Sequence, residues 1–294
     1  MKIMKVLILK TGYSETLDPE IGQTVSLGDV LRSTVIIHPF RGDHITWVVD
    51  QAALSLLSGI EALDRLLIWD FNTALQLMSE RFDVVVNLEK SPGISALASR
   101  INAWQRYGFR FDDWRGDAQA YRESIPAFST YITNMEAKKT AGRPWQEVLF
   151  EMLGMTWTGE EYLLGIHPTT LSSTMLKGRI GLNHKVGGKF PGKAWPHFEE
   201  FQGQTAPACS WQEGENLQDY VNWINSCEVI VTNDSLGLHL AIALKRKFVA
   251  LFGPTSVHEV HDYGLGVKLI APDGDMANIP VERVRREVLK LLAA

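Results

Sequence analysis

The stretch from Glu228 to Thr255 constrains the fold of this chain more than any other. It begins with a short apolar, β-branched run, Val229–Thr232, which predicts a buried strand because the run is too short for a buried helix. Helix N-cap residues follow directly at Asn233–Ser235. A second strand is predicted over Phe248–Phe252, which is apolar on both faces, like strands in a covered parallel sheet. The stretch therefore predicts a strand, a helix and a parallel second strand.

Polar and small residues gather at the predicted start of that helix. In parallel sheets, ligands bind outside the carboxyl ends of the strands, and a helix N-terminus there offers free N–H groups to a phosphate. The residues that this pattern brings together are Asp234, Ser235, Gly237 and His239. An alternative remains open at this point: Asp234 or Ser235 only caps the helix, and His239 only packs against the sheet.

Composition limits the classes of protein to which the chain can belong. With 294 residues, of which 45% are hydrophobic, it is long enough for one large or two medium globular domains. Its 29 basic and 34 acidic residues include no basic run, which argues against a nucleic-acid partner. Two cysteines are too few for a disulfide scaffold, so a cytoplasmic location is expected. No apolar run reaches the roughly 18 residues needed to span a bilayer.

The first half of the chain alternates between strand and helix patterns. After a first strand at Val6–Leu9, strands are predicted at His44–Val49, Arg65–Trp69 and Asp83–Leu88, with helices between them. This alternation predicts an α/β fold with a parallel, doubly wound sheet. The G-x-G-x-x-G motif of dinucleotide-dependent oxidoreductases is missing after the first strand, which disfavours hydride transfer.

The second half repeats the alternation. Strands are predicted at Leu163–Pro168 and Arg179–Asn183, with a weak strand near Pro207–Trp211, a helix at Leu217–Ser226 and an amphipathic helix at Val281–Leu292. We place the domain boundary near Trp157–Glu161. The chain then divides into an N-terminal domain, residues 1–158, and a C-terminal domain, residues 159–294.

Four motifs, in this order along the chain, resemble those of the heptosyltransferase family, glycosyltransferase family 9. They are Gly28-Asp29-Val30-Leu31, Arg106-Tyr107-Gly108-Phe109, Lys193-Ala194-Trp195-Pro196, and the block from Asp234 to Leu244 that is followed by Phe252-Gly253-Pro254-Thr255. The chain departs from the family pattern at Leu236, where a glycine is usual and is here delayed to Gly237. The resemblance implies two Rossmann-like domains facing a cleft, the GT-B architecture.

The resemblance also implies a catalytic base in the N-terminal domain. The family's aspartate in the G-D-V-L motif corresponds to Asp29. From the residues alone, Asp29 also suits a helix N-cap, with a helix running to about Ile37, and that alternative stays open. The segment Tyr13–Thr24 is longer than the corresponding family segment, so we expect it to reshape the entrance for the acceptor.

Donor binding is expected in the C-terminal domain. The loop from His184 to Lys193 is basic and glycine-rich, a composition that suits a diphosphate and is also shared by plain surface loops. Together with the resemblance, this predicts a donor site made of Lys185, Gly188, Lys193, Glu213, Asp234, Ser235, Leu236, Gly237, His239 and Thr255. Glu213 is the candidate ribose-binding carboxylate, because family members place one in this region.

Acceptor binding is expected at Lys90, Arg106 and Arg110, close to a segment where aromatic and charged residues interleave; a solvated loop is the alternative there. No metal or other cofactor is expected, because the D-x-D triplet at Asp273–Asp275 is ordinary turn chemistry.

The resemblance implies inverting sugar transfer from a nucleotide-diphosphate donor to a hydroxyl group of a glycan or glycolipid. ADP-heptose is the first candidate donor that it implies. A nucleotide-sugar hydrolase or epimerase, and a non-catalytic nucleotide-sugar-binding protein, are the alternatives. The expected location is cytoplasmic, and peripheral association with the inner membrane face is compatible with the sequence.

Overall fold

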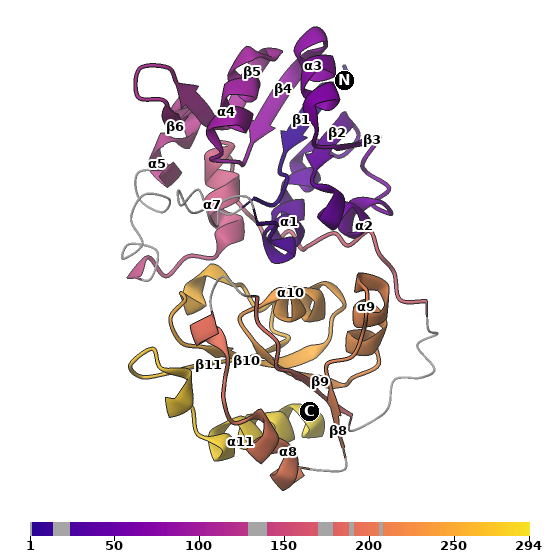
Figure 1. The fold of residues 1–294 in the computed structure, drawn as a ribbon, viewed down its shortest axis with the longest axis vertical. Helices are drawn as coiled ribbons and strands as arrows, with labels where there is room; N and C mark the ends of the chain where they lie inside the picture. Colours follow the sequence, from indigo (N-terminus) through magenta and orange to yellow (C-terminus); the bar gives the residue numbers. More distant parts are fainter. Residues whose placement is uncertain (1, 14–23, 129–139, 170–178, 188–190, 206–207) are drawn as a thin grey trace. The chain divides into compact units, whose positions relative to one another are not determined.

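A computed structural model describes residues 2–13, 24–128, 140–169, 179–187, 191–205 and 208–294. The chain divides into two compact units, Met1–Gly165 and Ile166–Ala294 (Figure 1). This division falls later than the predicted boundary at 158/159, because the intervening segment is hydrogen bonded within the first unit. The Leu163 N–H donates to Thr34 Oγ1 at 2.8 Å, and the Gly165 N–H donates to the Leu56 carbonyl at 2.7 Å.

The predicted strand at Leu163–Pro168 is wrong, since residues 163–168 form no strand. An apolar run becomes a strand only where a neighbouring strand accepts its backbone hydrogen bonds. Here the backbone N–H groups of Leu163 and Gly165 are used by a side chain and by a short helix instead.

The first unit contains a six-stranded sheet in the order β3-β2-β1-β4-β5-β6. All neighbouring strands are parallel except β5 and β6. The chain winds from β1 outward to β3 and then returns to β4, so the winding direction reverses between β1 and β4. The strands are β1 (Lys5–Leu9), β2 (His44–Val49), β3 (Arg65–Ile68), β4 (Arg81–Asn87), β5 (Asn102–Asp112) and β6 (Asp117–Ala120).

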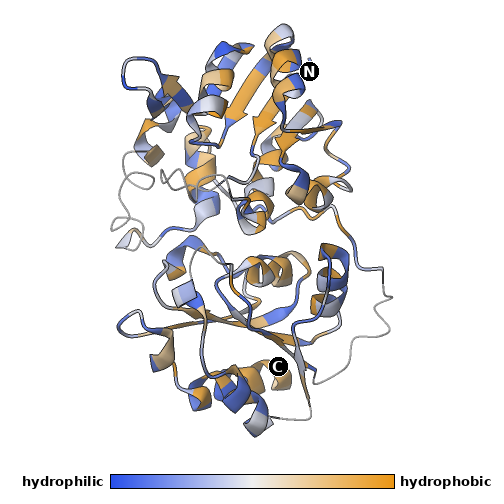
Figure 2. Cartoon of the chain, viewed as in Figure 1, coloured by the Kyte–Doolittle hydropathy of each residue, from blue (hydrophilic) through white to orange (hydrophobic). Residues whose placement is uncertain are grey.

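Helices cover this sheet through apolar side chains. Leu77 lies in α3, Ile94 lies in α4 and Ile101 follows α4 directly. These three side chains pack with Leu7 and Val85 of the central strands in one buried cluster. The central strands β1, β2 and β4 are accordingly hydrophobic along most of their length (Figure 2). The helices are α1 (Leu27–Ser33), α2 (Leu54–Leu57), α3 (Phe71–Ser79), α4 (Pro92–Arg100), α5 (Ile125–Ala127) and α7 (Trp145–Met152), and a 3₁₀ segment, η1 (Thr34–Phe40), follows α1.

The second unit contains a five-stranded sheet, β11-β10-β9-β7-β8, in which every pair is parallel. Its winding direction reverses between β7 and β9. The predicted unit of strand, helix and strand is confirmed as β9, α10 and β10. The elements are β7 (Ile180–Asn183), α8 (Phe198–Thr205), β8 (Cys209–Trp211), α9 (Leu217–Asn225), β9 (Val229–Asn233), α10 (Leu236–Ala243), β10 (Lys247–Phe252), β11 (Gly266–Ile270) and α11 (Val281–Ala293).

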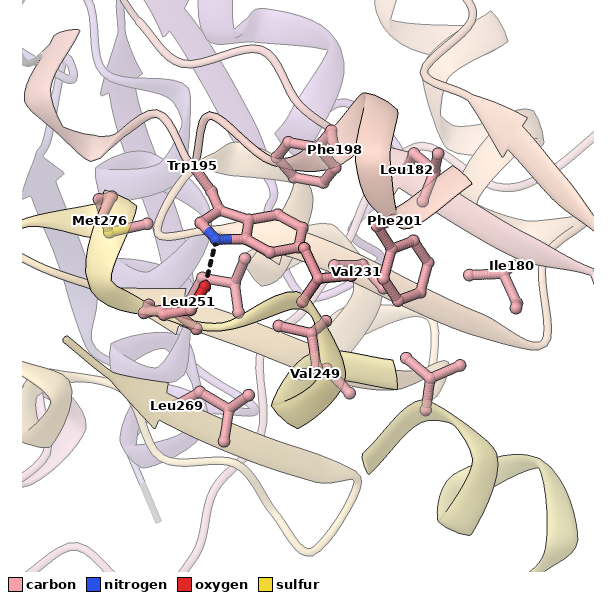
Figure 3. Close-up of a cluster of buried hydrophobic side chains, with 14 of the residues drawn as sticks. Ile180, Leu182, Trp195, Phe198, Phe201, Val231, Val249, Leu251, Leu269 and Met276 are labelled. Atoms are coloured by element: carbon pink, nitrogen blue, oxygen red, sulfur yellow. Dashed lines mark hydrogen bonds between the residues drawn. The ribbon is translucent and has the colours of Figure 1, made fainter. Parts of the chain in front are cut away.

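An aromatic cluster holds the second unit together. Trp195, Phe198 and Phe201 are buried against Val231 and Leu251 of the central strands (Figure 3). The Trp195 indole N–H donates to the Ile279 carbonyl at 2.9 Å, so this ring is both buried and hydrogen bonded. Trp195 thereby ties the segment that carries Lys193 to the core.

An ion-pair cluster at the amino end of the first sheet gives a prediction about acid stability. Arg65 donates two hydrogen bonds to the Glu80 carboxylate, at 2.8 and 3.0 Å, and Lys5 Nζ lies 2.5 Å from Glu80 Oε2. The hydrogen bonds from Arg65, more than any other contact, lower the pKa of Glu80 from 4.5 to about 2. A carboxylate with a lowered pKa stabilises the folded state above its unfolded pKa and loses that contribution as the pH falls through the folded pKa.

We therefore expect the free energy of unfolding to fall between pH 4.5 and about 2, and to fall less in a Glu80→Gln variant. Urea unfolding at several pH values measures this difference. Parallel pH profiles for the two proteins would contradict it.

Candidate functional site

The carboxyl ends of β7 and β9 meet at the reversal point of the second sheet, and an asparagine ends each strand. Asn183, at the end of β7, is fully buried; its Nδ2 donates to Thr232 Oγ1 at 2.7 Å and to Ser235 Oγ at 2.9 Å. Its Oδ1 accepts a hydrogen bond from the Tyr220 hydroxyl. Open parallel sheets bind ligands at such a reversal point, so this is the first place to look for a site.

The second asparagine, Asn233, anchors both ends of the basic loop. Its Nδ2 donates to the His184 carbonyl, and its Oδ1 accepts from the Trp195 N–H, each at 3.0 Å. Because His184 and Trp195 flank the segment that carries Lys185 and Lys193, one buried amide holds both ends of this segment at the start of α10.

Asp234 is the centre of the polar cluster. Its Oδ2 lies 2.9 Å from Lys193 Nζ and accepts a hydrogen bond from Thr255 Oγ1 at 2.7 Å. Burial raises the pKa of the Asp234 carboxyl, but Lys193, His239 and Thr255 together outweigh burial and hold this pKa below its ordinary value. The carboxylate is therefore charged at neutral pH, and it fixes an ammonium group next to the N-terminus of α10.

The N-terminus of α10 lies within this cluster. Ser235 is the N-cap residue, but its hydroxyl accepts from Asn183 and makes no capping hydrogen bond to the helix. The reading of Asp234 or Ser235 as a simple side-chain cap is therefore wrong. Leu236 is the first helical residue, and His239 lies one turn on, buried, as its packing alternative required. The Leu238 N–H donates to the Ser235 carbonyl at 3.1 Å, so Leu236 and Gly237 carry the N–H groups that can bind an anion at this helix start.

Gly237 lets α10 approach β7 and α9 closely. A Cβ atom at this position would overlap the amide of Asn183 and the hydroxyl of Tyr220. We expect Gly237→Ala to lower the free energy of unfolding by about 1–3 kcal/mol, because both partners are fixed by hydrogen bonds.

Gly203→Ala in α8 is the matched control for this substitution. Nothing lies within 4 Å of its added Cβ, so it should stabilise the protein by about 0.5–1 kcal/mol. Urea unfolding of both variants compares them, and equal effects would show that the close approach at Gly237 is unimportant.

The remaining predicted donor residues lie at the border of the cluster. Lys185 is exposed, and its backbone N–H donates to Gln212 Oε1 at 3.2 Å. Glu213 follows β8; its side chain is 68% exposed and accepts from Ser210 Oγ at 3.3 Å. Gly188 lies outside the described residues. The structure thus brings Lys193, Asp234, Ser235 and Thr255 together and places Lys185 and Glu213 nearer to solvent.

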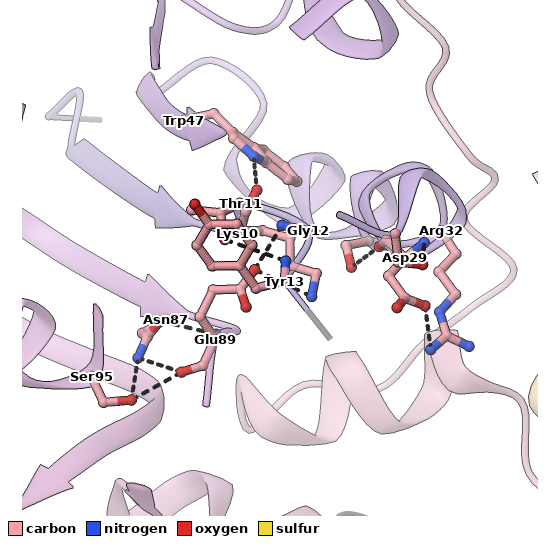
Figure 4. A network of polar contacts seen from close by, with 12 residues as sticks. Lys10, Thr11, Gly12, Tyr13, Asp29, Arg32, Trp47, Asn87, Glu89 and Ser95 are labelled. Atoms are coloured by element: carbon pink, nitrogen blue, oxygen red, sulfur yellow. Dashed lines mark hydrogen bonds and ion pairs between the residues drawn. The ribbon is translucent and has the colours of Figure 1, made fainter. Parts of the chain in front are cut away.

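In the first unit, Asp29 lies in the first turn of α1 (Figure 4). Its Oδ1 lies 2.8 Å from Arg32 Nη2, and its side chain is partly exposed. The prediction of Asp29 as an N-cap is wrong, because Ser26 caps the helix: its Oγ accepts from the Asp29 N–H at 3.4 Å. The α-helix also ends at Ser33 rather than near Ile37, and the 3₁₀ segment η1 continues from Thr34. The Asp29 carboxylate is therefore not needed to cap its own helix.

The three predicted acceptor residues are not all in one place. Lys90 follows β4 and is buried; its Nζ lies 5.9 Å from the ring centre of Phe109, beside a small cavity that Lys10 also lines. Arg106 donates instead to the carbonyls of Ala98 and Ile101 at the end of α4, near the amino end of the sheet. Arg110 is paired with Asp112, at 3.6 Å, on β5. Only Lys90 lies at the carboxyl end of the central strands.

Four residues in or next to these sites were not predicted from the sequence: Asn183 and Tyr220 in the second unit, and Lys10 and Glu89 in the first. The one signal for them in the sequence was an asparagine at the end of each of two predicted buried strands, Asn183 and Asn233. A tyrosine within an amphipathic helix and a lysine after a strand are common, so their roles follow only from the strand order.

Carboxylates of the D-x-D triplet serve the local backbone. Asp273 accepts from the Asp275 N–H at 3.1 Å and from Asn278 Nδ2 at 2.7 Å, while Asp275 caps the next 3₁₀ segment. Over the described ranges, no group of three or more His, Cys, Asp or Glu residues is arranged to hold a metal ion. Within those same ranges, no helix is long and apolar enough to cross a bilayer.

Comparison with known proteins agrees with this geometry. Residues 215–274, which include β9, α10 and β10, match the family model of glycosyltransferase family 9 (heptosyltransferase). A 41-residue segment is 49% identical to lipooligosaccharide heptosyltransferase 2 of Haemophilus influenzae, a match that covers 14% of this chain and 12% of the relative. These two matches confirm the predicted resemblance to the heptosyltransferase family in this part of the chain.

Solved structures resemble the chain over nearly its whole length. The E. coli ADP-heptose LPS heptosyltransferase II is 18% identical, covers 99% of both chains and has a TM-score of 0.67. An E. coli heptosyltransferase solved with ADP is 17% identical, covers 98% of this chain and 97% of its own, and has a TM-score of 0.61. The predicted fold, two Rossmann-like domains of the GT-B class, is confirmed.

Proposed function

We propose that this chain is an inverting glycosyltransferase that moves a sugar from a nucleotide-diphosphate donor to a hydroxyl acceptor, with ADP-heptose as the first donor to test. The observation that carries this proposal is the cluster of Lys193, Asp234 and Thr255 at the N-terminus of α10. It lies at the reversal point of the second sheet, and Asp234 and Thr255 fall inside the segment that matches the family model.

In this proposal the second unit binds the donor. A leaving nucleotide diphosphate gains negative charge as the glycosidic bond breaks, so the enzyme must place positive potential beside it. The N–H groups of Leu236 and Gly237 at the start of α10 and the Lys193 ammonium supply that potential. Asp234 holds Lys193 in place, and the exposed Lys185 adds charge at the border of the site.

The first unit supplies the base. The Asp29 carboxylate takes the proton from the acceptor hydroxyl, and the oxygen forms a bond to the anomeric carbon on the face opposite the diphosphate. The bond from that carbon to the phosphate oxygen breaks, and the nucleotide diphosphate leaves with the electron pair. Arg32 Nη2, at 2.8 Å from Asp29 Oδ1, holds the carboxylate in place on the surface of α1. No metal ion takes part in this scheme.

The acceptor in this proposal is a hydroxyl group of a glycan or glycolipid. Lys90, buried at the carboxyl end of β4, is the predicted acceptor residue that best fits this role, because it lies on the same edge of the sheet as α1. A cytoplasmic location is proposed because Cys209 and Cys227 are free thiols. Association with the inner membrane face would bring the enzyme to a glycolipid acceptor.

A donor screen tests this proposal. The protein is incubated with ADP-, GDP-, UDP- or dTDP-sugars in EDTA, with and without a glycan acceptor, and released nucleotide is measured. We expect release from one nucleotide class that depends on the acceptor. Free sugar formed without acceptor would indicate a hydrolase, whereas tight binding without turnover would indicate a binding protein.

A further inference from the structure

A lysine and a glutamate are paired in the interior of the first unit, at the reversal point between β1 and β4. Lys10 Nζ lies 3.4 Å from Glu89 Oε1, and the two side chains are 2% and 1% exposed. Burial raises the pKa of Glu89 even though Lys10 lies beside it. Buried ion pairs contribute little to stability compared with apolar residues of similar size, so this pair calls for another explanation.

A chain of hydrogen bonds leads from this pair to the helix that carries Asp29. Figure 4 shows Lys10, Gly12 and Glu89 at one end of this chain and Asp29 at the other. Glu89 Oε1 accepts from the Gly12 N–H at 2.8 Å, and the Gly12 carbonyl accepts from the Ser26 N–H at 2.6 Å. Ser26 is the N-cap of α1, and its Oγ accepts from the Asp29 N–H. Two residues, Gly12 and Ser26, therefore separate the buried carboxylate from the first turn of α1.

The turn at Gly12 is held tightly against α1. Gly12 has a φ of +99°, which favours glycine, and a Cβ atom there would lie 2.7 Å from Cγ2 of Val30. The bond between Gly12 and Ser26 also joins the two sides of the Tyr13–Thr24 insertion. The position of α1 therefore depends on this turn.

The backbone of Glu89 is itself fixed. Its N–H donates to Asn87 Oδ1 at 3.0 Å, and its carbonyl accepts from Asn87 Nδ2 at 3.1 Å and from Ser95 Oγ at 3.0 Å. Both partners are fully buried. The carboxylate thus projects from a hydrogen-bonded segment directly after β4, as a positioning group requires.

We propose that Lys10 and Glu89 are positioning residues for Asp29. Lys10 holds the Glu89 carboxylate, the carboxylate holds the Gly12 turn, and the turn holds the capped end of α1. The inference rests on the proposed function, in which Asp29 is the catalytic base. It adds that the position of the base depends on this buried pair.

Two double variants separate this role from plain stability. Lys10→Met/Glu89→Gln removes both charges but keeps an amide oxygen that can accept from Gly12. Lys10→Met/Glu89→Leu removes the charges and the acceptor together, with a side chain of similar size. We expect the Leu variant to lose about 10- to 100-fold in kcat, because small displacements of a reacting group cost that much. The Gln variant should lose less, because its amide oxygen can still accept from the Gly12 N–H.

Two further measurements accompany kcat. The KM for the donor should be unchanged in both variants, and the amides of α1 should exchange hydrogen faster in the Leu variant alone. If the Leu variant does not fold, Glu89→Asp withdraws the carboxylate by one methylene, and the same loss of kcat is expected. Glu80→Gln, which breaks an ion pair at the amino end of the same sheet, controls for lost stability and should leave kcat unchanged.

Equal kcat and equal exchange in the two double variants would overturn the proposal. If the proposed function is wrong, the result is different. The wild-type protein then transfers no sugar, but the amides of α1 still exchange hydrogen faster in the Leu variant than in the Gln variant.

Discussion

Asp29→Asn is expected to reduce sugar transfer by about 10²- to 10⁴-fold, the range for loss of a general base, while donor affinity stays near the wild-type value. Asparagine has the same shape as aspartate but cannot accept the proton of the acceptor hydroxyl. Because Ser26 caps α1, the substitution removes only the ion pair with Arg32 and should leave the protein folded. Turnover at saturating donor and acceptor, together with calorimetry of donor binding, measures both effects.

Asp70→Asn is the matched control. Asp70 Oδ1 accepts from the Thr73 N–H at 2.6 Å and caps α3, so it is an aspartate whose role is structural. We expect this variant to transfer sugar like the wild type. If Asp29→Asn keeps more than about a tenth of wild-type turnover, well above the range for a lost base, the base is another carboxylate. Glu15, Asp18 and Glu20 of the insertion, which lie outside the described residues, are then the next to test.

Lys193→Ala is expected to weaken binding of the nucleotide diphosphate by about 10- to 100-fold, since a hydrogen bond to a charged group contributes about 1.5–3 kcal/mol. Two effects act in the same direction. The ammonium group is lost, and the Asp234 carboxylate, only 15% exposed, loses its cation and repels the diphosphate. Calorimetry at one fixed salt concentration measures the change, because charge interactions are screened by salt.

Lys247→Ala controls for the loss of a lysine in the same unit. Lys247 Nζ donates to the Leu291 carbonyl at 2.8 Å, away from the α10 N-terminus, so its removal should not change donor affinity. His239→Ala should weaken binding as well, although less than Lys193→Ala, because His239 is buried within α10. Unchanged affinity in both Lys193→Ala and His239→Ala would place the donor site elsewhere.

Local patterns predicted the elements of this fold well. The apolar, β-branched run that becomes β9, the small-residue helix α10 and the apolar β10 were each visible in the sequence, because each is set by neighbouring residues. Residues 163–168 show the limit of this reasoning: the run is apolar enough for a strand, but no neighbouring strand pairs with it. Whether a strand forms depends on partners far away in the sequence.

The candidate sites were predictable only in part, for the same reason. Asp234 and Lys193 could be named from motifs, but the buried amides that hold them, Asn183 and Asn233, depend on the pairing of β7 with β9. Arg106 shows a second limit. An arginine suits a phosphate or sugar ligand and suits the carbonyls at a helix end equally well, and only the structure distinguishes these uses.

The central claim is that the chain transfers a sugar with inversion and without a metal ion. The most direct test is the NMR spectrum of the product formed in EDTA, in which the one-bond carbon–proton coupling at the anomeric carbon reports the configuration. We predict a glycoside whose anomeric configuration is opposite to that of the donor, formed at the same rate with and without EDTA. A product that retains the donor configuration, or transfer that stops in EDTA and returns with a divalent ion, would contradict the account.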